Sequence, residues 1–134
     1  MTSYRAHFKP SHFLQKPHAM LATAVVCADT DEEADRLAAT VDLNIVRRNK
    51  GEYLPLASPE EAAAYPYSPI DRDRAKANRA RVFVGSPATV KQKLMPLIEA
   101  TKADEVMITS AIFDHAARKR SYTLMAEAFE LTAA

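Results

Sequence analysis

The chain has 134 residues, of which 48% are hydrophobic and 26% are charged, and its formal net charge at pH 7 is +1. This length indicates one domain, since domains mostly contain about 100 to 150 residues, and it is too short for a closed eight-stranded α/β barrel of about 250 residues. Eighteen basic against seventeen acidic residues create no overall field that would attract nucleic acid or a membrane surface, so neither is expected as a partner.

The first 28 residues contain an aromatic leader and then a strand. Residues 1–17 carry Tyr4, Phe8 and Phe13, and they look like the last turn of a helix that begins upstream, because so short a helix is marginal by itself in water. Residues 19–28 form a ten-residue run without a charge, rich in β-branched side chains, which predicts a buried strand.

The single cysteine, Cys27, lies inside that predicted strand. One cysteine cannot form an internal disulfide, and its apolar surroundings predict a buried, inert thiol in a reducing compartment. The leader lacks the apolar core of a signal peptide, and no apolar run reaches the roughly 18 residues of a membrane span. We therefore expect a cytoplasmic protein.

A helix is predicted directly after the strand, over residues 31–50. Thr30 and Glu33 have the spacing of a capping box, apolar residues then recur every three or four positions, and Gly51 follows a basic last turn as a stop. An acidic metal site is the alternative interpretation of this first turn, but capping and the helix dipole explain its acidic residues without a metal, so none is expected. The residues concerned are Asp29, Asp31, Glu32 and Glu33.

Residues 52–81 have a weaker pattern that prolines interrupt. Two short helices are predicted to begin at Ser58-Pro59 and Ser68-Pro69, with serine as cap and proline in the first turn. The second is polar almost all round, which is typical of a solvated helix, a partner contact or a mobile insertion. Its five basic residues are offset by two aspartates and are not interleaved with aromatic residues, so nucleic acid is not favoured.

An extended piece over residues 82–84 ends at Gly85 and is followed by a helix that Ser86 caps and Pro87 opens. Pro96 lies inside this helix, where it removes one backbone donor, and it predicts a kink or break. Because Gly51 and Gly85 are the only glycines of the chain, no glycine-rich phosphate-binding loop is expected.

The stretch over residues 104–131 combines a second strand with a final helix. Residues 106–112 form an apolar run without alternation, as in a parallel strand covered on both faces, and Asp114 stands at the N-cap of the helix. A strand, a polar turn and a helix make half of a βαβ unit. Since parallel α/β folds place their sites beyond the carboxyl ends of the strands, any chemistry is expected at this turn.

Three segments, in this order, resemble the carboxyl-terminal part of bacterial luciferase-like flavin-dependent monooxygenases. They are YRAHFKPS with the strand ending in ADTDEEADRLA, then VGSPATVKQKL, and then ADEVMITSAIFDHAARKRSYTLMAEAF. The resemblance implies an α/β fold made of the last (β/α) units of a TIM barrel, too short to close a barrel alone. On this mapping the single domain 1–134 holds the seventh βα unit at 18–51, an insertion at 52–81, and a helix plus the eighth βα unit at 82–134.

The same resemblance implies where the site residues lie. The rim of the cofactor or substrate site would come from the two strand ends, and His115 would be the catalytic residue, exchanging a proton near neutral pH with Asp114 beside it to raise its basicity. The alternative is that Asp114 caps the helix and His115 is a first-turn residue half in water. The expected rim residues are Asp29, Thr30, Thr109, Ser110 and Asp114.

The resemblance further implies a parent protein that oxidises a small organic substrate with reduced flavin (FMN) and O2. The flavin phosphate contacts of this family come from earlier strands, so the piece alone is expected to bind no flavin and to show no turnover. Two parallel strands cannot cover both faces and both edges of a sheet, so self-association by strand addition or helix exchange is expected. The alternative is a small non-enzymatic α/β module that dimerises or binds a partner through residues 72–81. A stand-alone hydrolase is disfavoured, because the chain has no nucleophile elbow.

Overall fold

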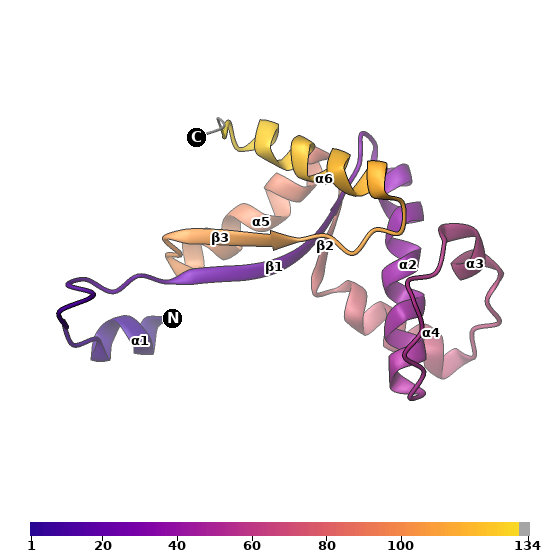
Figure 1. Cartoon of the computed structure of the whole chain (residues 1–134), viewed down its shortest axis with the longest axis horizontal. Helices are drawn as coiled ribbons and strands as arrows, with labels where there is room; N and C mark the ends of the chain where they lie inside the picture. The colour runs from indigo at the N-terminus through magenta and orange to yellow at the C-terminus, as the bar shows by residue number, and fades with distance from the viewer. Residues whose placement is uncertain (132–134) are drawn as a thin grey trace.

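The computed structural model describes residues 1–131 as a small open α/β structure (Figure 1). No helix within these residues combines the length and the apolar character needed to cross a membrane. In chain order the elements are α1 (Thr2–His7), β1 (Met20–Cys27), α2 (Asp31–Asn49), α3 (Pro59–Ala64), α4 (Pro69–Arg79), β2 (Val82–Gly85), α5 (Pro87–Thr101), β3 (Glu105–Thr109) and α6 (His115–Ala128).

The three strands form one parallel sheet in the order β2-β1-β3, so the predicted α/β class is confirmed and the sheet does not close. β3 pairs with the amino-terminal half of β1, from Met20 to Ala24, whereas β2 pairs with the carboxyl-terminal half, from Ala24 to Cys27. The expectation of only two strands was wrong. The extended piece before Gly85 is a third strand, because its backbone pairs with the carboxyl-terminal half of β1 on the edge opposite β3.

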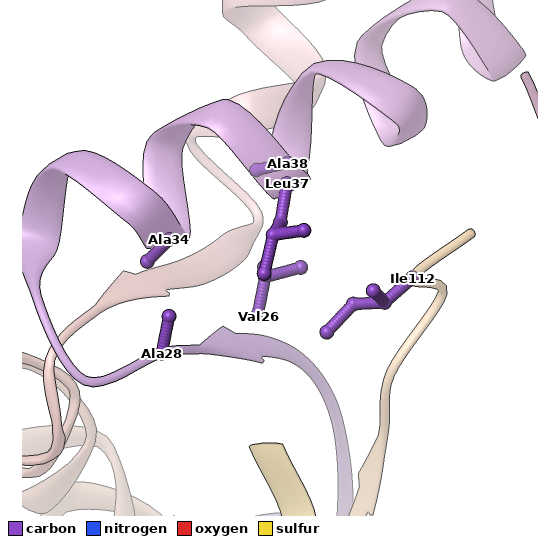
Figure 2. Packing of buried hydrophobic residues seen from close by; sticks show 6 residues of the cluster. All are labelled: Val26, Ala28, Ala34, Leu37, Ala38 and Ile112. Carbon is purple, nitrogen blue, oxygen red and sulfur yellow. The ribbon is translucent and has the colours of Figure 1, made fainter. Parts of the chain in front are cut away.

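Helices cover both faces of the sheet around the carboxyl-terminal half of β1. Val26 and Ala28 pack against α2 in one cluster, which Ile112 completes from the loop after β3 (Figure 2). Val25 and Cys27 point to the opposite face, where they meet Val90 of α5 and residues of α6. This double coverage explains the carboxyl-terminal part of the uncharged run, residues 25–28, since neither face of the strand end meets water.

The amino-terminal half of the sheet is covered on one face only within residues 1–131. Val106 and Ile108 of β3 are half-buried beneath α5 and α6, whereas Met107 is 49% exposed and Met20 of β1 is 46% exposed. The prediction that this strand is covered on both faces was therefore wrong for the described residues. One face of this half of the sheet is therefore exposed within the described residues. We call it the bare face; it comprises Met20, Ala22, Met107 and Thr109.

Helix α2 begins and ends close to the positions that its cap residues predict. The Thr30 side chain accepts a hydrogen bond from the Glu33 backbone N–H at 3.2 Å, but the reciprocal half of the capping box is not formed. The Glu33 carboxylate instead accepts two hydrogen bonds from Arg36, each at 2.8 Å. Gly51 has φ +79°, the left-handed conformation expected of a glycine stop.

Helices α3 and α4, from the weakly patterned region, both pack on α2. Ion pairs hold α4: Arg79 of α4 pairs with Asp35 and Asp42 of α2, and Asp71 of α4 pairs with Lys50 at 2.8 Å. A reciprocal capping box does form here, between Ser68 and Asp71. These ion pairs join α4 to α2 although α4 has no apolar stripe.

Helix α5 continues through Pro96 without a break. Of the predicted kink or break, the break was therefore wrong, while a kink stays a prediction. Pro96 and Gln92, whose carbonyl loses its partner, both lie on the exposed side of the helix, where water can satisfy that carbonyl. Val90 and Leu94 on the other side are fully buried and hold the helix against the sheet.

The Lys50–Asp71 pair predicts a pH-dependent stability. The hydrogen bond from Lys50 is the main cause that lowers the pKa of the Asp71 carboxyl to about 2. An aspartate of the unfolded chain has a pKa of about 3.9. The pair therefore stabilises the fold fully above about pH 4, and this stabilisation is lost as the pH falls towards the folded pKa. We expect Asp71→Asn to be less stable than wild type at neutral pH, and this difference to shrink in acid. Urea unfolding at a series of pH values measures it, with exposed Asp73→Asn as the control. A difference that is constant down to pH 2 would contradict the assignment.

Candidate functional site at the carboxyl ends of the strands

Asp29 and Thr30 follow β1 and are both held by specific partners. The Asp29 carboxylate accepts hydrogen bonds from the Arg120 guanidinium of α6 at 2.6 and 3.3 Å. The bond from Arg120 also lowers the pKa of Asp29. Thr30 is the N-cap of α2. At this strand end, the two predicted rim residues thus join β1 to α6 and start α2.

Ser110, which follows β3, is buried and lies in a polar network that ties both strand ends to α6. Its hydroxyl donates to the Val25 carbonyl at 2.7 Å, and its backbone N–H donates to the Tyr122 hydroxyl at 3.0 Å. Ser121, fully buried on α6, accepts the Cys27 N–H at 3.0 Å and lies 3.4 Å from the Ser110 hydroxyl. Because the Ser110 proton goes to Val25, Ser121 is the donor between the two hydroxyls.

Ser121 and Tyr122 were missed by the sequence analysis. The signal that could have found Ser121 is its spacing, because it stands four residues after Ala117 and three before Leu124, inside the apolar stripe of the last helix. A hydroxyl in such a stripe needs a buried partner. The partner itself, a backbone N–H 94 residues away, could not be named from the sequence.

Asp114 and His115 lie at the start of α6. The Asp114 carboxylate accepts the Ala117 N–H at 2.7 Å, so Asp114 is the N-cap, as predicted. His115 is exposed, and its Nδ1 accepts a hydrogen bond from Arg118 at 2.9 Å. The nearest charged partner of His115 in the structure is thus a cation rather than the Asp114 carboxylate. A proton-exchange role for His115 stays a prediction.

Thr109 is the predicted rim residue that lies on the bare face. It is exposed, in register with Ala24 of β1, and its hydroxyl donates to the Thr23 carbonyl at 3.4 Å. The structure therefore brings Ser110 together with the ends of both strands, but it leaves Thr109 on the sheet surface and His115 in solvent. The predicted site residues do not converge on one pocket within the described chain.

Asp31 has a role that the sequence analysis did not assign. Its carboxylate accepts the Ser86 N–H at 2.6 Å and the Thr89 hydroxyl at 3.0 Å, and these bonds lower its pKa. Asp31 therefore joins the start of α2 to the start of α5. A Cβ on Gly85 would lie 2.8 Å from an Asp31 oxygen, so this junction needs a glycine.

No metal site was predicted, and three of the acidic residues after β1, Asp29, Asp31 and Glu33, are engaged with Arg120, Ser86 and Arg36. Across the part of the chain that the structure describes, no three His, Cys, Asp or Glu side chains gather as metal ligands. Cys27 is fully buried, and burial is the main cause that raises the pKa of its thiol to about 11. Such a thiol is almost entirely protonated near neutral pH, as the prediction of an inert cysteine requires.

These observations define an open parallel α/β structure with polar networks at the carboxyl ends of its strands. No protein-family model matches the chain. The chain is 42% identical over 126 residues to the uncharacterized protein YceB of Bacillus subtilis (strain 168), a match that covers 94% of this chain and 38% of YceB. It is 33% identical over 121 residues to a luciferase-like monooxygenase of Escherichia coli (strain K12), covering 90% of this chain and 36% of that protein.

Among solved structures, the crystal structure of apo-MsnO8 matches with a TM-score of 0.86 and 36% identity, over 99% of this chain and 41% of that one. The chain thus spans about two-fifths of the length of each of these relatives. Along nearly all of its own length it is similar to part of a luciferase-like monooxygenase, and to that extent the predicted resemblance is confirmed.

Proposed function

We propose that this chain is the carboxyl-terminal part of a luciferase-like flavin-dependent monooxygenase. The whole protein would oxidise a small organic substrate with reduced flavin and O2, and the part alone would be inactive. The observation that carries this proposal is that the matches cover 90% to 99% of this chain but only 36% to 41% of the length of the relatives. The absence of a possible disulfide favours a reducing compartment, so we place the parent in the cytoplasm.

The open sheet supports this proposal. In a TIM barrel every strand has a neighbour on each side, helices cover the outside, and side chains of the strands fill the inside. With β1 as the seventh and β3 as the eighth strand, α5 and α6 would lie outside and the bare face would be part of the inner wall. Helix α2, which packs on the same side of β1 at Val26 and Ala28, would then cover the carboxyl-terminal end of that wall. Thr109 would then line the cavity, while Asp29, Ser110 and Asp114 would hold the loops around it.

The described residues do not fit the flavin phosphate. A helix N-terminus binds anions well, but in residues 1–131 the N-terminus of α5 receives the Asp31 carboxylate and that of α6 the Asp114 carboxylate. Arg120, which faces the same end of the sheet, is already paired with Asp29. We therefore derive no flavin step from these residues, and within this proposal the phosphate is held by the rest of the parent.

A chimera tests the proposal. The part of the E. coli luciferase-like monooxygenase that matches this chain is replaced by residues 1–134, and FMN binding is measured by fluorescence titration. The chimera should bind FMN about as tightly as the intact E. coli protein. The truncated E. coli protein, which keeps the proposed phosphate site in an open barrel, should bind more weakly, and the isolated chain should not bind. Micromolar binding by the isolated chain would show that the phosphate site is misplaced. A folded chimera that binds no better than the truncated protein would overturn the proposal.

A further inference from the structure

Helices α3 and α4 pack on α2 at the end of the molecule away from α1, and the three helices line a groove of about 630 Å³ (Figure 1). Sites for small molecules usually have volumes of about 300 to 1,000 Å³. The lining of this groove comes entirely from residues 35–80. Its apolar part consists of alanine methyl groups from all three helices, those of Ala39, Ala62 and Ala75, and of the Tyr67 ring.

The groove lies on a side of α2 that is turned away from the sheet. Helix α2 packs on the sheet through Ala34 and Leu37, whereas it lines the groove through Asp35, Ala39 and Asp42. These two sets of residues lie about a third of a turn apart, since a helix has about 3.6 residues per turn. The groove is therefore formed by the packing of this chain's own helices, and it is not a consequence of the open sheet edges.

The charged groups around the groove have an excess of cations. Arg79 donates hydrogen bonds to both Asp35 and Asp42, so these three side chains satisfy one another. Arg72 and Lys76 stand one turn apart on α4, and the ion pairs that α4 forms within residues 1–131 do not include them. Three basic against two acidic side chains give the lining a net charge of +1. The groove therefore favours an anion with an apolar body.

Arg72 is tied in place at this groove. Its Nε donates to the Tyr67 carbonyl at 3.4 Å, which leaves the two terminal nitrogens of the guanidinium for a ligand. Two parallel hydrogen bonds from one guanidinium match the geometry of a carboxylate. Burial is the main cause that raises the pKa of the Tyr67 hydroxyl. This hydroxyl is therefore uncharged at neutral pH and does not repel an anion.

We propose that the groove between α2, α3 and α4 binds a small aromatic carboxylate. The carboxylate accepts hydrogen bonds from Arg72 and Lys76, and the ring lies on the alanine methyl groups beside Tyr67. A flat ring suits a floor of methyl groups, and a neighbouring tyrosine adds edge or offset contacts with it. Charge favours the anion over an uncharged molecule of the same shape. The proposal concerns the 134-residue chain and does not depend on the monooxygenase assignment.

Phenylacetate is the probe that tests this site, and phenylacetamide is its uncharged counterpart of nearly equal shape. In an NMR titration of the isotope-labelled chain, we expect phenylacetate to bind with a dissociation constant of about 1 mM, a usual value for so small a ligand. Phenylacetamide should bind at least about tenfold more weakly. The shifted amides should lie in α3 and α4. Shifts centred on Ile98 and Phe129 would place the ligand in another groove, between α5 and α6, and would overturn the proposal.

Three variants complete the test. Arg72→Gln should weaken phenylacetate binding about tenfold. Arg74→Gln is the matched control, because it removes the same charge from an exposed position of the same helix that does not line the groove. Ala39→Leu should abolish the binding of both probes by filling the groove, and circular dichroism checks that each variant is folded.

The two arginine variants decide the proposal even if Ala39→Leu does not fold. Equal losses of affinity in Arg72→Gln and Arg74→Gln would mean that the anion responds only to the general charge of α4. That result, equal binding of the two probes to wild type, or no saturable shift up to about 10 mM phenylacetate would overturn the proposal.

Discussion

Replacing Ile112 by alanine should lower the free energy of unfolding by about 2 to 5 kcal/mol, the usual cost of truncating a buried aliphatic side chain. Ile112 is 1% exposed and comes from the loop after β3, yet it packs with Val26 and Leu37 (Figure 2). No other residue of that loop enters the cluster that covers the α2 side of β1. Its loss would therefore leave a cavity between the sheet and α2, and it would also free the loop that carries Ser110 and Asp114.

The neighbouring residue supplies the control. Phe113 is larger than Ile112 but 52% exposed, so we expect Phe113→Ala to change the stability by only about 0.5 kcal/mol. Urea unfolding of the two variants and of wild type, all at one protein concentration, measures both effects. Equal losses for the two variants would mean that Ile112 does not anchor the loop in solution.

The elements that could be predicted are those whose signals are local in the sequence. The strand before Asp29 and the helix after Thr30 follow from an uncharged run, a cap and a periodic stripe, which are all set by residues within a few positions of one another. The N-cap at Asp114 is equally local. Helix α4 was harder to interpret, because it meets α2 through Arg79 and Asp71, and charged residues give no inward stripe.

What could not be predicted depends on pairings that are distant in the sequence. The strand before Gly85 has only four residues, and its place in the sheet is decided by its pairing with distant residues of β1, from Ala24 to Cys27, on the edge opposite β3. The junction of Asp31 with Ser86 joins residues 55 positions apart. The burial of β3 was overestimated for a different reason. An apolar run indicates that both faces of a strand can be buried, but it does not show whether residues of this chain bury them.

The candidate site divides in the same way. That polar residues end both strands was evident from the sequence, and the structure places Asp29 and Ser110 at those ends. Their partners Arg120 and Ser121 are consecutive residues of α6, so a single helix fixes the ends of two strands. This arrangement makes α6 the element on which the geometry of the strand ends depends.

Replacing Ser121 by alanine is the most direct test of that dependence. Its hydroxyl is fully buried and accepts the Cys27 N–H at 3.0 Å, so the alanine variant leaves a buried backbone donor without a partner. Such a group costs about 1 to 3 kcal/mol, and we expect a loss of stability in this range. Thr123→Ala is the matched control, because Thr123 also carries a hydroxyl on α6 but is exposed, and its removal should cost no more than about 0.5 kcal/mol.

Urea unfolding of the two single variants, of Ser110→Ala and of the double variant Ser110→Ala/Ser121→Ala separates the network from its parts. The Ser110 hydroxyl donates to Val25 and accepts from Ser121, so the two serines share one network and their effects should not add. The double variant should therefore lose less stability than the sum of the single losses, since part of the network is already broken by either change. Additive losses, or a Ser121→Ala variant as stable as Thr123→Ala, would show that the serines do not couple the strand ends to α6.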